Sequence, residues 1–416
     1  MIKLNLPRLM PWQQEVLNTQ NLYYNKSKTF VIKSSRQKGK SFLICIIALV
    51  RALQKPNRCV IVVSPTNNQN FRIWKQLKSA IANTRICQAA NGGLLSFTLC
   101  NNSEIIFKSA MQNDALRGFT TNSCLIVDEA AFIDDSTWEI ILPFISKWRA
   151  ELFLFSTPLF REGLFYKLYN EGMKGSEDVF SFDWSDNTKY DFSEFITEKQ
   201  INQYKSMYSP LKFTTEILGE FVSENSFVFG NFMECVKDYA DLENEIPFYA
   251  GLDFATGVGG DSTVLTVMND KGDVIDIWAT NSLNTNDQIE KLAEYINERP
   301  TFKHILVESN SIGKVFYDAL VARLNHKSII KGFNTSNKSK RDIIEKLITN
   351  FQNKRISIPN NNELHKQLSS FVVKKIASGY SYENSSSVIH DDYVMSLALC
   401  NWSKSSINAG SFGFAN

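Results

Sequence analysis

The sequence lacks three features that would each assign a class of protein at once. Its 416 residues carry a formal net charge of only +2, so no overall basic character points to a nucleic-acid partner. No uncharged apolar run is long enough to span a membrane, and the N-terminus lacks the apolar core and cleavage site of a secretory leader. We therefore expect a soluble, cytoplasmic protein in which local patches make any contact with a polyanion.

The seven cysteines are scattered, and none belongs to a C-x-x-C pair. Such pairs would indicate a zinc site or a redox motif, and neither is predicted here. Cys45, Cys59, Cys124 and Cys400 lie in apolar runs, where a small core residue is expected. The composition, 44% hydrophobic and 21% charged, is that of globular protein, and the length predicts more than one domain.

The stretch from Val31 to Ser41 has the pattern of a phosphate-binding loop. A short extended lead-in enters a polar turn that ends in Gly-Lys-Ser, and a helical apolar run, residues 42–53, follows. In this context backbone N–H groups hold the phosphates, Lys40 reaches the β and γ phosphates, and the Ser41 hydroxyl ligates Mg²⁺. The first glycine of the usual pattern is Ser34, so a basic loop capping a helix is the alternative for this stretch alone.

A second element of an ATP site follows at residues 123–129, where an apolar strand ends in Asp128-Glu129. Asp128 would hold Mg²⁺, and Glu129 would polarise the attacking water as general base. An acidic helix cap is the alternative, but the upstream Gly-Lys-Ser loop favours ATP hydrolysis. A later strand ends in Ser156-Thr157-Pro158, which either senses the γ-phosphate or forms a plain turn.

Two flanking segments fit the same site. Gln13, at the start of an expected helix, either reads adenine through its amide or is a surface residue. Residues 159–225 are aromatic and helical in pattern, and we expect part of them to close as a lid over the nucleotide.

The second half of the chain places acidic residues at strand ends and at a helix start, namely Asp253, Glu308 and the pair Asp391-Asp392. A carboxylate at the end of an apolar strand is costly to bury unless it is paired or ligates a metal, and oxygen clusters suit Mg²⁺ or Mn²⁺. Two such ions can activate water for phosphodiester hydrolysis. Singly, each acid is a cap or a surface charge. Together, in the order β-β-β-α-β-α, they are typical of the ribonuclease-H superfamily and favour a nuclease.

Two further features flank these acids. Asp261 is either an auxiliary metal ligand or a structural turn residue beside glycines. Lys338, Lys340 and Arg341 belong to a basic cluster that would hold DNA phosphates, or they form a solvated helix start.

An ATPase followed by a ribonuclease-H-like nuclease resembles the large terminase subunit of tailed bacteriophages, from Leu9 to about Trp402. In that family the phosphate loop often departs from the consensus and carries an arginine, as residues 34–41 do here. The resemblance implies that the nucleotide is bound by Gln13, Ser35, Arg36, Gln37, Lys38, Gly39, Lys40, Ser41, Asp128 and Thr157. It also implies a catalytic arginine, which is either Arg117, reaching a neighbouring subunit, or Arg36.

For the nuclease, the resemblance implies metal ligation by Asp253, Glu308 and Asp392, with Asp261 as an extra acid. Spacing does not decide between Asp391 and Asp392. The implied fold class is α/β: a P-loop NTPase domain with a mostly parallel sheet, then a ribonuclease-H-like α/β nuclease domain. We expect the ATPase domain at 1–225, with a lid at about 185–225, a linker at 226–247, the nuclease at 248–404, and a flexible tail at 405–416.

The resemblance implies a ring of subunits on the portal vertex that hydrolyses ATP to drive double-stranded DNA into an empty capsid. The nuclease would cut concatemeric DNA. The implied cofactors are ATP and Mg²⁺, with Mn²⁺ possible at the nuclease. The implied partners are DNA, the portal protein, the small terminase subunit and further copies of the chain in the host cytoplasm, with no membrane. One alternative is a helicase-like DNA translocase with a non-cleaving C-terminal domain. Another is a degenerate interaction protein without turnover.

Overall fold

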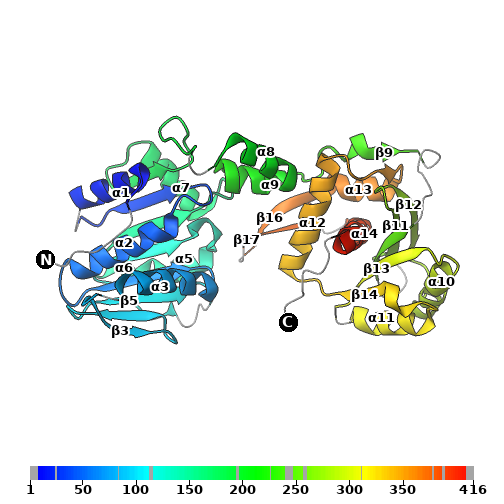
Figure 1. Cartoon of the computed structure of the whole chain (residues 1–416), viewed down its shortest axis with the longest axis horizontal. Helices are drawn as coiled ribbons and strands as arrows, with labels where there is room; N and C mark the ends of the chain where they lie inside the picture. The colour runs from blue at the N-terminus through cyan, green and yellow to red at the C-terminus, as the bar shows by residue number, and fades with distance from the viewer. Residues whose placement is uncertain are drawn as a thin grey trace. The chain divides into compact units, whose positions relative to one another are not determined.

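A computed structural model describes residues 8–23, 26–82, 84–111, 116–193, 196–224, 226–238, 247–255, 260–310, 312–376, 379–386 and 389–408. The chain forms two compact units (Figure 1). The first comprises residues 1–204, 211–224 and 375–379, and the second comprises 205–210, 225–374 and 380–416. Among the described residues, no helix has the length and apolar character needed to cross a membrane.

The first unit is built on a mostly parallel sheet, as the sequence predicted. From β5 onward all neighbours in the order β5-β2-β6-β7-β1-β8 pair in parallel, while β3 and β4 add an antiparallel edge. The central strands β6 and β7 are buried along their whole length, as expected for strands covered on both faces. The strands are β1 (Thr29–Lys33), β2 (Cys59–Ser64), β3 (Cys87–Asn91), β4 (Ser96–Leu99), β5 (Glu104–Ser109), β6 (Cys124–Asp128), β7 (Glu151–Ser156) and β8 (Val179–Asp183).

Helices cover both faces of this sheet and connect its strands. They are α1 (Pro11–Leu22), α2 (Lys40–Leu53), α3 (Asn67–Ile81), the short 3₁₀ helix η1 (Ala130–Phe132), α5 (Asp135–Ile141), α6 (Pro143–Ser146) and α7 (Gly163–Met173). After α8 (Glu198–Met207) and α9 (Pro210–Lys212), residues Phe213–Leu218 form a π-helix, η2. The segment from 159 to 225 is therefore not purely helical, because it supplies the edge strand β8 beside β1.

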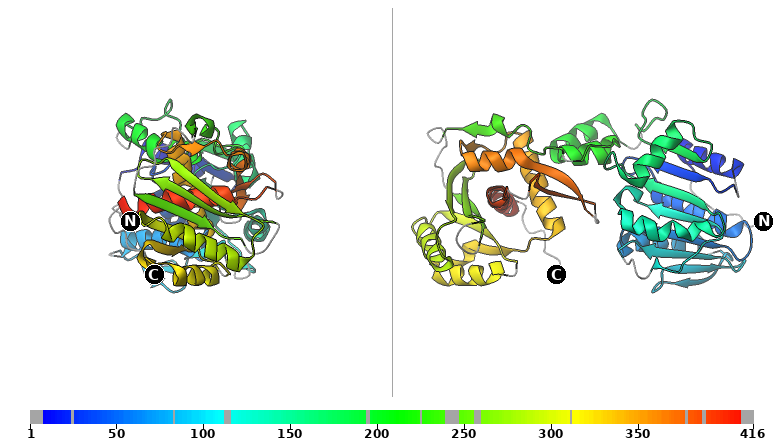
Figure 2. Two further views of the ribbon diagram at one scale, coloured as in Figure 1. Left: turned by 90° about the vertical axis from the view of Figure 1, so that its right-hand side faces the viewer. Right: turned by 180° about the vertical axis from the view of Figure 1, so that it is seen from behind.

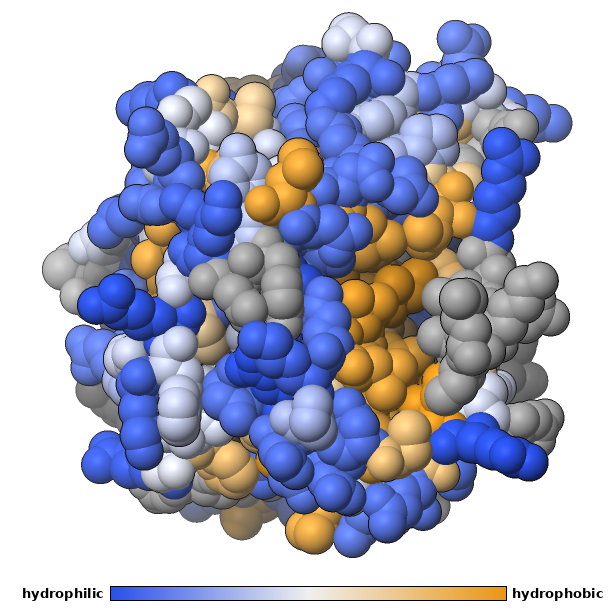
Figure 3. Space-filling model, turned by 90° about the vertical axis from the view of Figure 1, so that its left-hand side faces the viewer, coloured by the Kyte–Doolittle hydropathy of each residue, from blue (hydrophilic) through white to orange (hydrophobic). Residues whose placement is uncertain are grey.

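The helix after the phosphate loop, α2, is apolar on all sides and carries no charge between Lys40 and Arg51. Its outer face and α3 line a cavity of about 580 Å³, to which α2 contributes Phe42, Cys45, Ile46 and Leu49. Figure 3, which views the side of the molecule on the left in Figure 1, shows a broad apolar hollow on this face.

A buried ion pair fixes the far end of α2. The Arg51 Nε lies 2.6 Å from the Glu151 Oε2, and both side chains are almost wholly withdrawn from water. The same guanidinium donates to the Gln20 carbonyl at 3.3 Å, which ties α1 to α2 and β7. Removing one partner of a buried ion pair typically lowers the free energy of unfolding by about 3–5 kcal/mol. The pair therefore holds α1, α2 and β7 firmly in their relative positions.

The second unit contains a five-stranded mixed sheet in the order β12-β11-β10-β13-β14. The first three strands are antiparallel, and β13 and β14 continue in parallel. These strands are β10 (Phe248–Asp253), β11 (Thr263–Asn269), β12 (Val274–Thr280), β13 (Phe302–Glu308) and β14 (Ile330–Phe333). Along the chain, β10, β11, β12, α10, β13 and α11 follow the order β-β-β-α-β-α that the sequence predicted for a ribonuclease-H-like domain.

Helices pack on both faces of the second sheet (Figure 2). One face packs on α10 (Thr285–Asn297) and α11 (Ile312–Arg323), and the other carries α14 (Asp392–Asn408) against β10. The remaining helices are α12 (Asn337–Gln352), α13 (Asn362–Ser370) and the 3₁₀ turns η3 (Phe232–Cys235) and η5 (Lys327–Ile329).

Several parts of the second unit differ from expectation. Described residues of the expected linker pack into the unit: Val228 N–H donates to the Phe371 carbonyl, and β9 (Val236–Lys237) pairs with β15 (Ile358–Pro359). The hairpin of β16 (Phe371–Ile376) and β17 (Gly379–Asn384) was not foreseen. The last helix continues to Asn408, so the start of the expected tail is helical, and residues 409–416 lie outside the described part.

The contact of α14 with β10 depends on a residue without a side chain, Gly251. A Cβ at this position would lie 2.2 Å from both the Cys400 nitrogen and the Ser396 carbonyl oxygen in the α14 backbone. We expect Gly251→Ala to destabilise the second unit by about 1–3 kcal/mol, because helix and strand must move apart. Urea unfolding followed by far-UV circular dichroism measures the loss. Gly230→Ala, at an exposed position with open space around it, is the control and should leave the midpoint unchanged.

Candidate functional site

The phosphate loop is anchored to the carboxyl edge of the first sheet. The Ser34 N–H donates to the Ser156 carbonyl at 3.0 Å, which joins the start of the loop to the end of β7. Gly39 has a φ of 79°, and a Cβ there would lie 2.5 Å from the Gln13 Nε2. Only glycine fits this turn, after which α2 begins at Lys40 with its N-terminus facing the loop.

Gln13 uses both ends of its amide for contacts within the chain. Its Oε1 accepts from the Met10 N–H at 3.0 Å, and its Nε2 donates to the Gly39 carbonyl at 3.2 Å. The side chain is also almost fully buried. The contact with adenine stays a prediction, and in this structure the same amide holds the phosphate loop.

The predicted general base is held from three directions. The Glu129 Oε2 accepts from the Ser156 hydroxyl at 3.3 Å and from the N–H and hydroxyl of Thr157, both at 3.2 Å. Its Oε1 lies 3.7 Å from the Lys40 Nζ. The residues predicted from three separate stretches thus meet, and the Ser156-Thr157 turn connects the general base to β7.

Asp128 lies at the end of β6 and is buried, and its Oδ1 has no hydrogen-bond partner among the described residues. Burial, with Glu129 beside it, raises the pKa of Asp128 to about 7, although Lys40 opposes the shift. A buried carboxylate oxygen without a donor is suited to a cation, and Ser41 lies next to Lys40 at the start of α2. Asp128 and Ser41 therefore fit a magnesium–nucleotide site.

The other predicted loop residues differ in their exposure. Ser35 and Lys38 are buried, whereas Arg36 and Gln37 are exposed. The Lys38 ammonium lies 3.3 Å from the centroid of the Phe192 ring, and burial lowers the pKa of Lys38 to about 8. Its side chain packs on an aromatic ring in this structure. Arg36 forms an ion pair with Glu216, a residue that sequence patterning did not single out.

Arg117, the other candidate for the catalytic arginine, is exposed just before Gly118, which has a φ of 91°. Among the described residues, no hydrogen bond or ion pair restrains its side chain. Such a residue is free to contact another molecule.

In the second unit, strand alternation selects which acids face α14. Ala250 and Leu252 of β10 belong to the apolar cluster with α10 and α11, so Asp253 lies on the opposite face. The same alternation in β13 places Ile305 and Val307 in that cluster and Glu308 on the face of α14. The helix α14 begins at Asp392, and the three predicted acids therefore converge.

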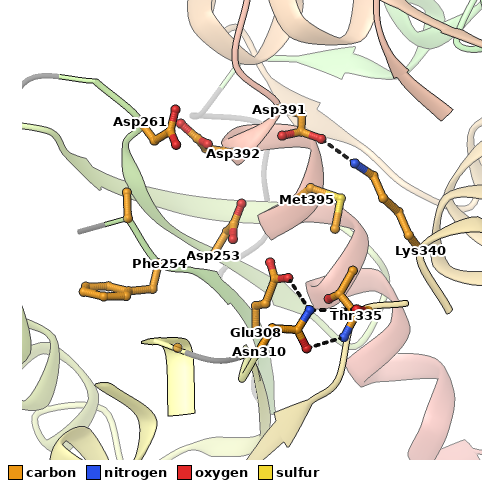
Figure 4. A pocket seen from close by; sticks show the side chains of 12 residues that line it. Asp253, Phe254, Asp261, Glu308, Asn310, Thr335, Lys340, Asp391, Asp392 and Met395 are labelled. Atoms are coloured by element: carbon orange, nitrogen blue, oxygen red, sulfur yellow. Dashed lines mark hydrogen bonds and ion pairs between the residues drawn. The ribbon is translucent and has the colours of Figure 1, made fainter. Parts of the chain in front are cut away.

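These acids line a cavity of about 450 Å³ (Figure 4). Its acidic lining comprises Asp253, Asp261, Glu308, Asp391 and Asp392, and Lys340 is the one lysine or arginine among the described lining residues. Loss of water, reinforced by Glu308, Asp392 and Asp391, holds the pKa of Asp253 well above its usual value. The pKa of Asp392 is raised to about 6, mainly by burial, although the Ser262 N–H donates to its Oδ2 at 2.6 Å.

The structure distinguishes Asp392 from Asp391. The Asp391 Oδ2 forms an ion pair with the Lys340 Nζ at 2.7 Å, as Figure 4 shows, while Asp392 remains beside Asp253 and is more deeply buried. Asp261 pairs with His390. Among the described residues, no three acidic, histidine or cysteine side chains converge closely enough to hold one ion as they stand.

The donor set nevertheless suits divalent cations. The centre of the cavity offers only carboxylate oxygens. One lysine and one histidine do not neutralise the negative charge of five acidic side chains. Hard cations with oxygen ligands fit such a site, and a polyanionic substrate could not approach it without them. Asp253, Glu308 and Asp392 are the residues that fit metal ligands best.

Asn310 is a site residue that the sequence analysis missed. Its Nδ2 donates to the Glu308 Oε1 at 3.3 Å and to the Thr335 carbonyl at 2.7 Å, and its Oδ1 accepts from the Thr335 N–H at 2.9 Å. It therefore orients Glu308 and attaches the loop before α12. In the sequence, its position two residues after Glu308 was the feature that could have indicated a role at this site.

The three predicted DNA-binding residues are not equivalent. Lys338 is exposed, whereas Lys340 is occupied by Asp391. The Arg341 Nη2 donates to the Tyr380 carbonyl at 2.6 Å, and its guanidinium stacks on the Tyr380 ring. Arg341 is therefore a structural residue in this conformation, and Lys338 is the one of the three that is free for a phosphate.

The crowding of carboxylates predicts a stabilising substitution. Because the folded-state pKa of Asp253 is raised, ionised Asp253 is unfavourable in the folded state above its usual pKa. In the presence of a chelator, Asp253→Asn should raise the free energy of unfolding of the second unit at pH 7 by about 1 kcal/mol or more. The gain should shrink as the pH falls toward 4, because the wild-type carboxyl group is then protonated.

Thermal melts of both proteins at pH 7 and pH 4.5 measure this difference. Asp318→Asn, at an exposed position on α11, removes the same charge and should change neither melt appreciably. A lower melting temperature for Asp253→Asn at pH 7 would show that the carboxylate of Asp253 stabilises the folded unit, against the expectation.

Comparison with known proteins identifies the family. Residues 31–235 match the N-terminal domain of T4-like terminase large subunits, and residues 250–401 match the terminase RNaseH-like domain. The terminase large subunit of Thermus virus P23-45 is 27% identical over an alignment of 323 residues, and the match covers 71% of this chain. The matched region spans only 64% of the length of that relative.

Solved structures show the same fold. The large terminase of a thermophilic bacteriophage has a TM-score of 0.66 at 16% identity, over 96% of this chain and 100% of that one. The same protein in complex with ADP has a TM-score of 0.64 and covers 98% of this chain. The matches of both halves to one kind of protein agree with the two sites, and the chain belongs to the family of terminase large subunits.

Proposed function

We propose that this chain is the ATP-driven motor that translocates double-stranded viral DNA into a procapsid, and the metal-dependent endonuclease that cuts the concatemeric genome. The observation that carries the proposal is the presence in one chain of two sites. The first joins Lys40, Asp128 and Glu129, and the second is the acidic cavity at Asp253, Glu308 and Asp392. The portal protein, the small terminase subunit and further copies of the chain in a ring are the proposed partners.

In the ATP site, the loop N–H groups and the N-terminus of α2 would bind the phosphates, with Lys40 at the β and γ positions. A bound Mg²⁺, held by Ser41 and Asp128, would supply charge neutralisation. Glu129 is already held by Ser156 and Thr157, so its carboxylate is positioned to accept a proton from water. The same contacts would transmit the loss of the γ-phosphate to β7. The ADP complex of the thermophilic phage terminase supports nucleotide binding by this fold.

In the nuclease site, Asp253, Glu308 and Asp392 would hold divalent cations, and these would supply activation of water and charge stabilisation for phosphodiester cleavage. Asn310 fixes Glu308, and the Ser262 N–H fixes Asp392. Lys338, together with Lys340 when Asp391 releases it, would contact DNA phosphates without reading sequence.

The ATP half is tested by hydrolysis. Lys40→Ala should abolish ATP binding, and Glu129→Gln should keep binding while lowering kcat by about 10²–10⁴-fold, because only the proton acceptor is lost. Phosphate release and nucleotide titration measure the two effects. Lys167→Ala, an exposed lysine on α7, is the matched control. Unchanged turnover in Lys40→Ala would refute the proposed phosphate loop.

The nuclease half is tested by nicking of supercoiled plasmid with Mg²⁺ or Mn²⁺. Asp253→Ala and Asp392→Asn should each lower the nicking rate by at least about 100-fold. Asp391→Asn should lower the nicking rate only about tenfold, because Asp391 forms an ion pair with Lys340. Chelation of the metal should stop cleavage. If Asp253→Ala nicks as fast as the unsubstituted protein, the helicase-like alternative with a non-cleaving C-terminal domain gains instead.

A further inference from the structure

A second hollow, a groove of about 570 Å³, lies beside the acidic cavity at the carboxyl ends of β13 and β14. The ends of these two strands and the first turns of α11 form it. Neither strand patterning nor the acidic constellation pointed to this part of the second unit. The side chains and backbone that line it include Ser309, Lys314, Tyr317, Asp318, Gly332 and Asn334.

The groove and the acidic cavity share a wall. Asn310 lines both of them, and two hydrogen bonds with the backbone of Thr335 hold its amide in place (Figure 4). On each side of Asn310, consecutive residues divide between the two hollows. Gly313 lines the cavity and Lys314 the groove, while Thr335 lines the cavity and Asn334 the groove. A polymer with one phosphate among the acids therefore finds the groove directly next to it.

The floor of the groove offers hydrogen-bonding groups that the fold itself does not use. Gly332 leaves room there, because a Cβ at this position would lie 2.8 Å from the Ser309 Oγ. Within the described ranges, neither the Ser309 hydroxyl nor the side-chain amide of Asn334 makes a hydrogen bond. Tyr317 forms a fixed side of the groove, since its hydroxyl donates to the Ile330 carbonyl at 3.3 Å. Polar groups without a partner in a preformed groove are available to a ligand.

The groove also differs from the cavity in charge. Five acids line the cavity, whereas Lys314 and Asp318 are the charged residues among the described lining of the groove. Lys314 is exposed, and its ammonium belongs to no ion pair in the part of the chain that the structure describes. Lys340 and Arg341, by contrast, are held by Asp391 and by a backbone carbonyl. A phosphodiester that the carboxylates of the cavity repel would meet a free cation in the groove.

We propose that this groove is a subsite of the nuclease that binds the DNA backbone at the nucleotide adjacent to the scissile phosphate. Lys314 is the phosphate contact, and Ser309 and Asn334 form hydrogen bonds with the same phosphate or its sugar. Because these groups reach the backbone and not the base edges, the subsite positions the strand without reading its sequence. The proposal rests on the nuclease function proposed above, and it adds the start of α11 to the surface that holds DNA.

The first test measures DNA affinity by the fluorescence anisotropy of a labelled DNA duplex over a range of salt concentrations. The full chain carries Asp253→Asn and a chelator is present, so that the strand is bound and not cut. Lys314→Gln should weaken binding by up to about fivefold, the effect of an exposed ion pair. It should also reduce the slope of log affinity against log salt by about 0.9, the value of one phosphate contact. Lys303→Gln, an exposed lysine at the amino end of β13, is the control and should change neither quantity.

The second test separates binding from chemistry in the chain with Asp253 intact. In nicking of supercoiled plasmid with Mn²⁺, Lys314→Gln should raise KM for DNA by up to about fivefold and leave kcat within about twofold. The reason is that a backbone contact outside the acidic cavity is made equally before and during cleavage. Lys303→Gln again serves as the control.

The outcomes distinguish this subsite from the nuclease on which it rests. An unchanged salt slope in Lys314→Gln, or a loss of affinity no larger than that of Lys303→Gln, would overturn the subsite while leaving the nuclease standing. A lower kcat with an unchanged KM would overturn it as well, because Lys314 would then act on the acidic cavity. Nicking that is indifferent to Asp253→Ala would overturn the nuclease itself. Circular dichroism of each variant establishes that a changed affinity does not arise from misfolding.

Discussion

The two sites depend on one physical constraint: carboxylates placed where they have lost much of their water. Asp128 ends a strand buried on both faces, and Asp253 faces α14 among other acids, so the pKa of each is raised. Such groups are unfavourable in the folded protein until a cation neutralises them. Both sheets carry such destabilising carboxylates at their carboxyl edges. Under the proposed function, a cation bound at each site would restore the stability that its crowded carboxylates remove.

The parts of this arrangement that follow from strand geometry were predictable from sequence. An acid at the end of an apolar strand lies at the carboxyl edge of a sheet, where ligand sites of α/β folds gather. This is why Asp128, Glu129, Asp253 and Glu308 could be assigned to sites, and why the parallel sheet and the ribonuclease-H-like order were foreseen. The alternation of β10 and β13 then fixes which face each acid occupies, without any knowledge of its neighbours.

Pairings between distant residues could not be predicted in this way. No local pattern indicates that the Gln13 amide is used by Met10 and Gly39, or that Arg36 meets Glu216. Lys340 was predicted to contact DNA because a basic helix start is a common phosphate site. In the structure its ammonium forms an ion pair with Asp391. The hairpin of β16 and β17 was missed for a related reason, because the burial of its strands depends on distant residues, although the sequence carries a Ser378-Gly379 pair at their junction.

The two ion pairs that were missed have a common consequence. In each, a cation suited to a phosphate, Arg36 or Lys340, is paired with a carboxylate of the chain. Under the proposed function, a phosphate would replace that carboxylate, so the net gain in binding free energy would be the difference between two interactions and smaller than either. Such modest differences would suit a motor that releases its nucleotide and its DNA in every cycle. Free cations at both positions would bind phosphate more tightly and release it more slowly, because most differences in affinity are expressed in the rate of dissociation.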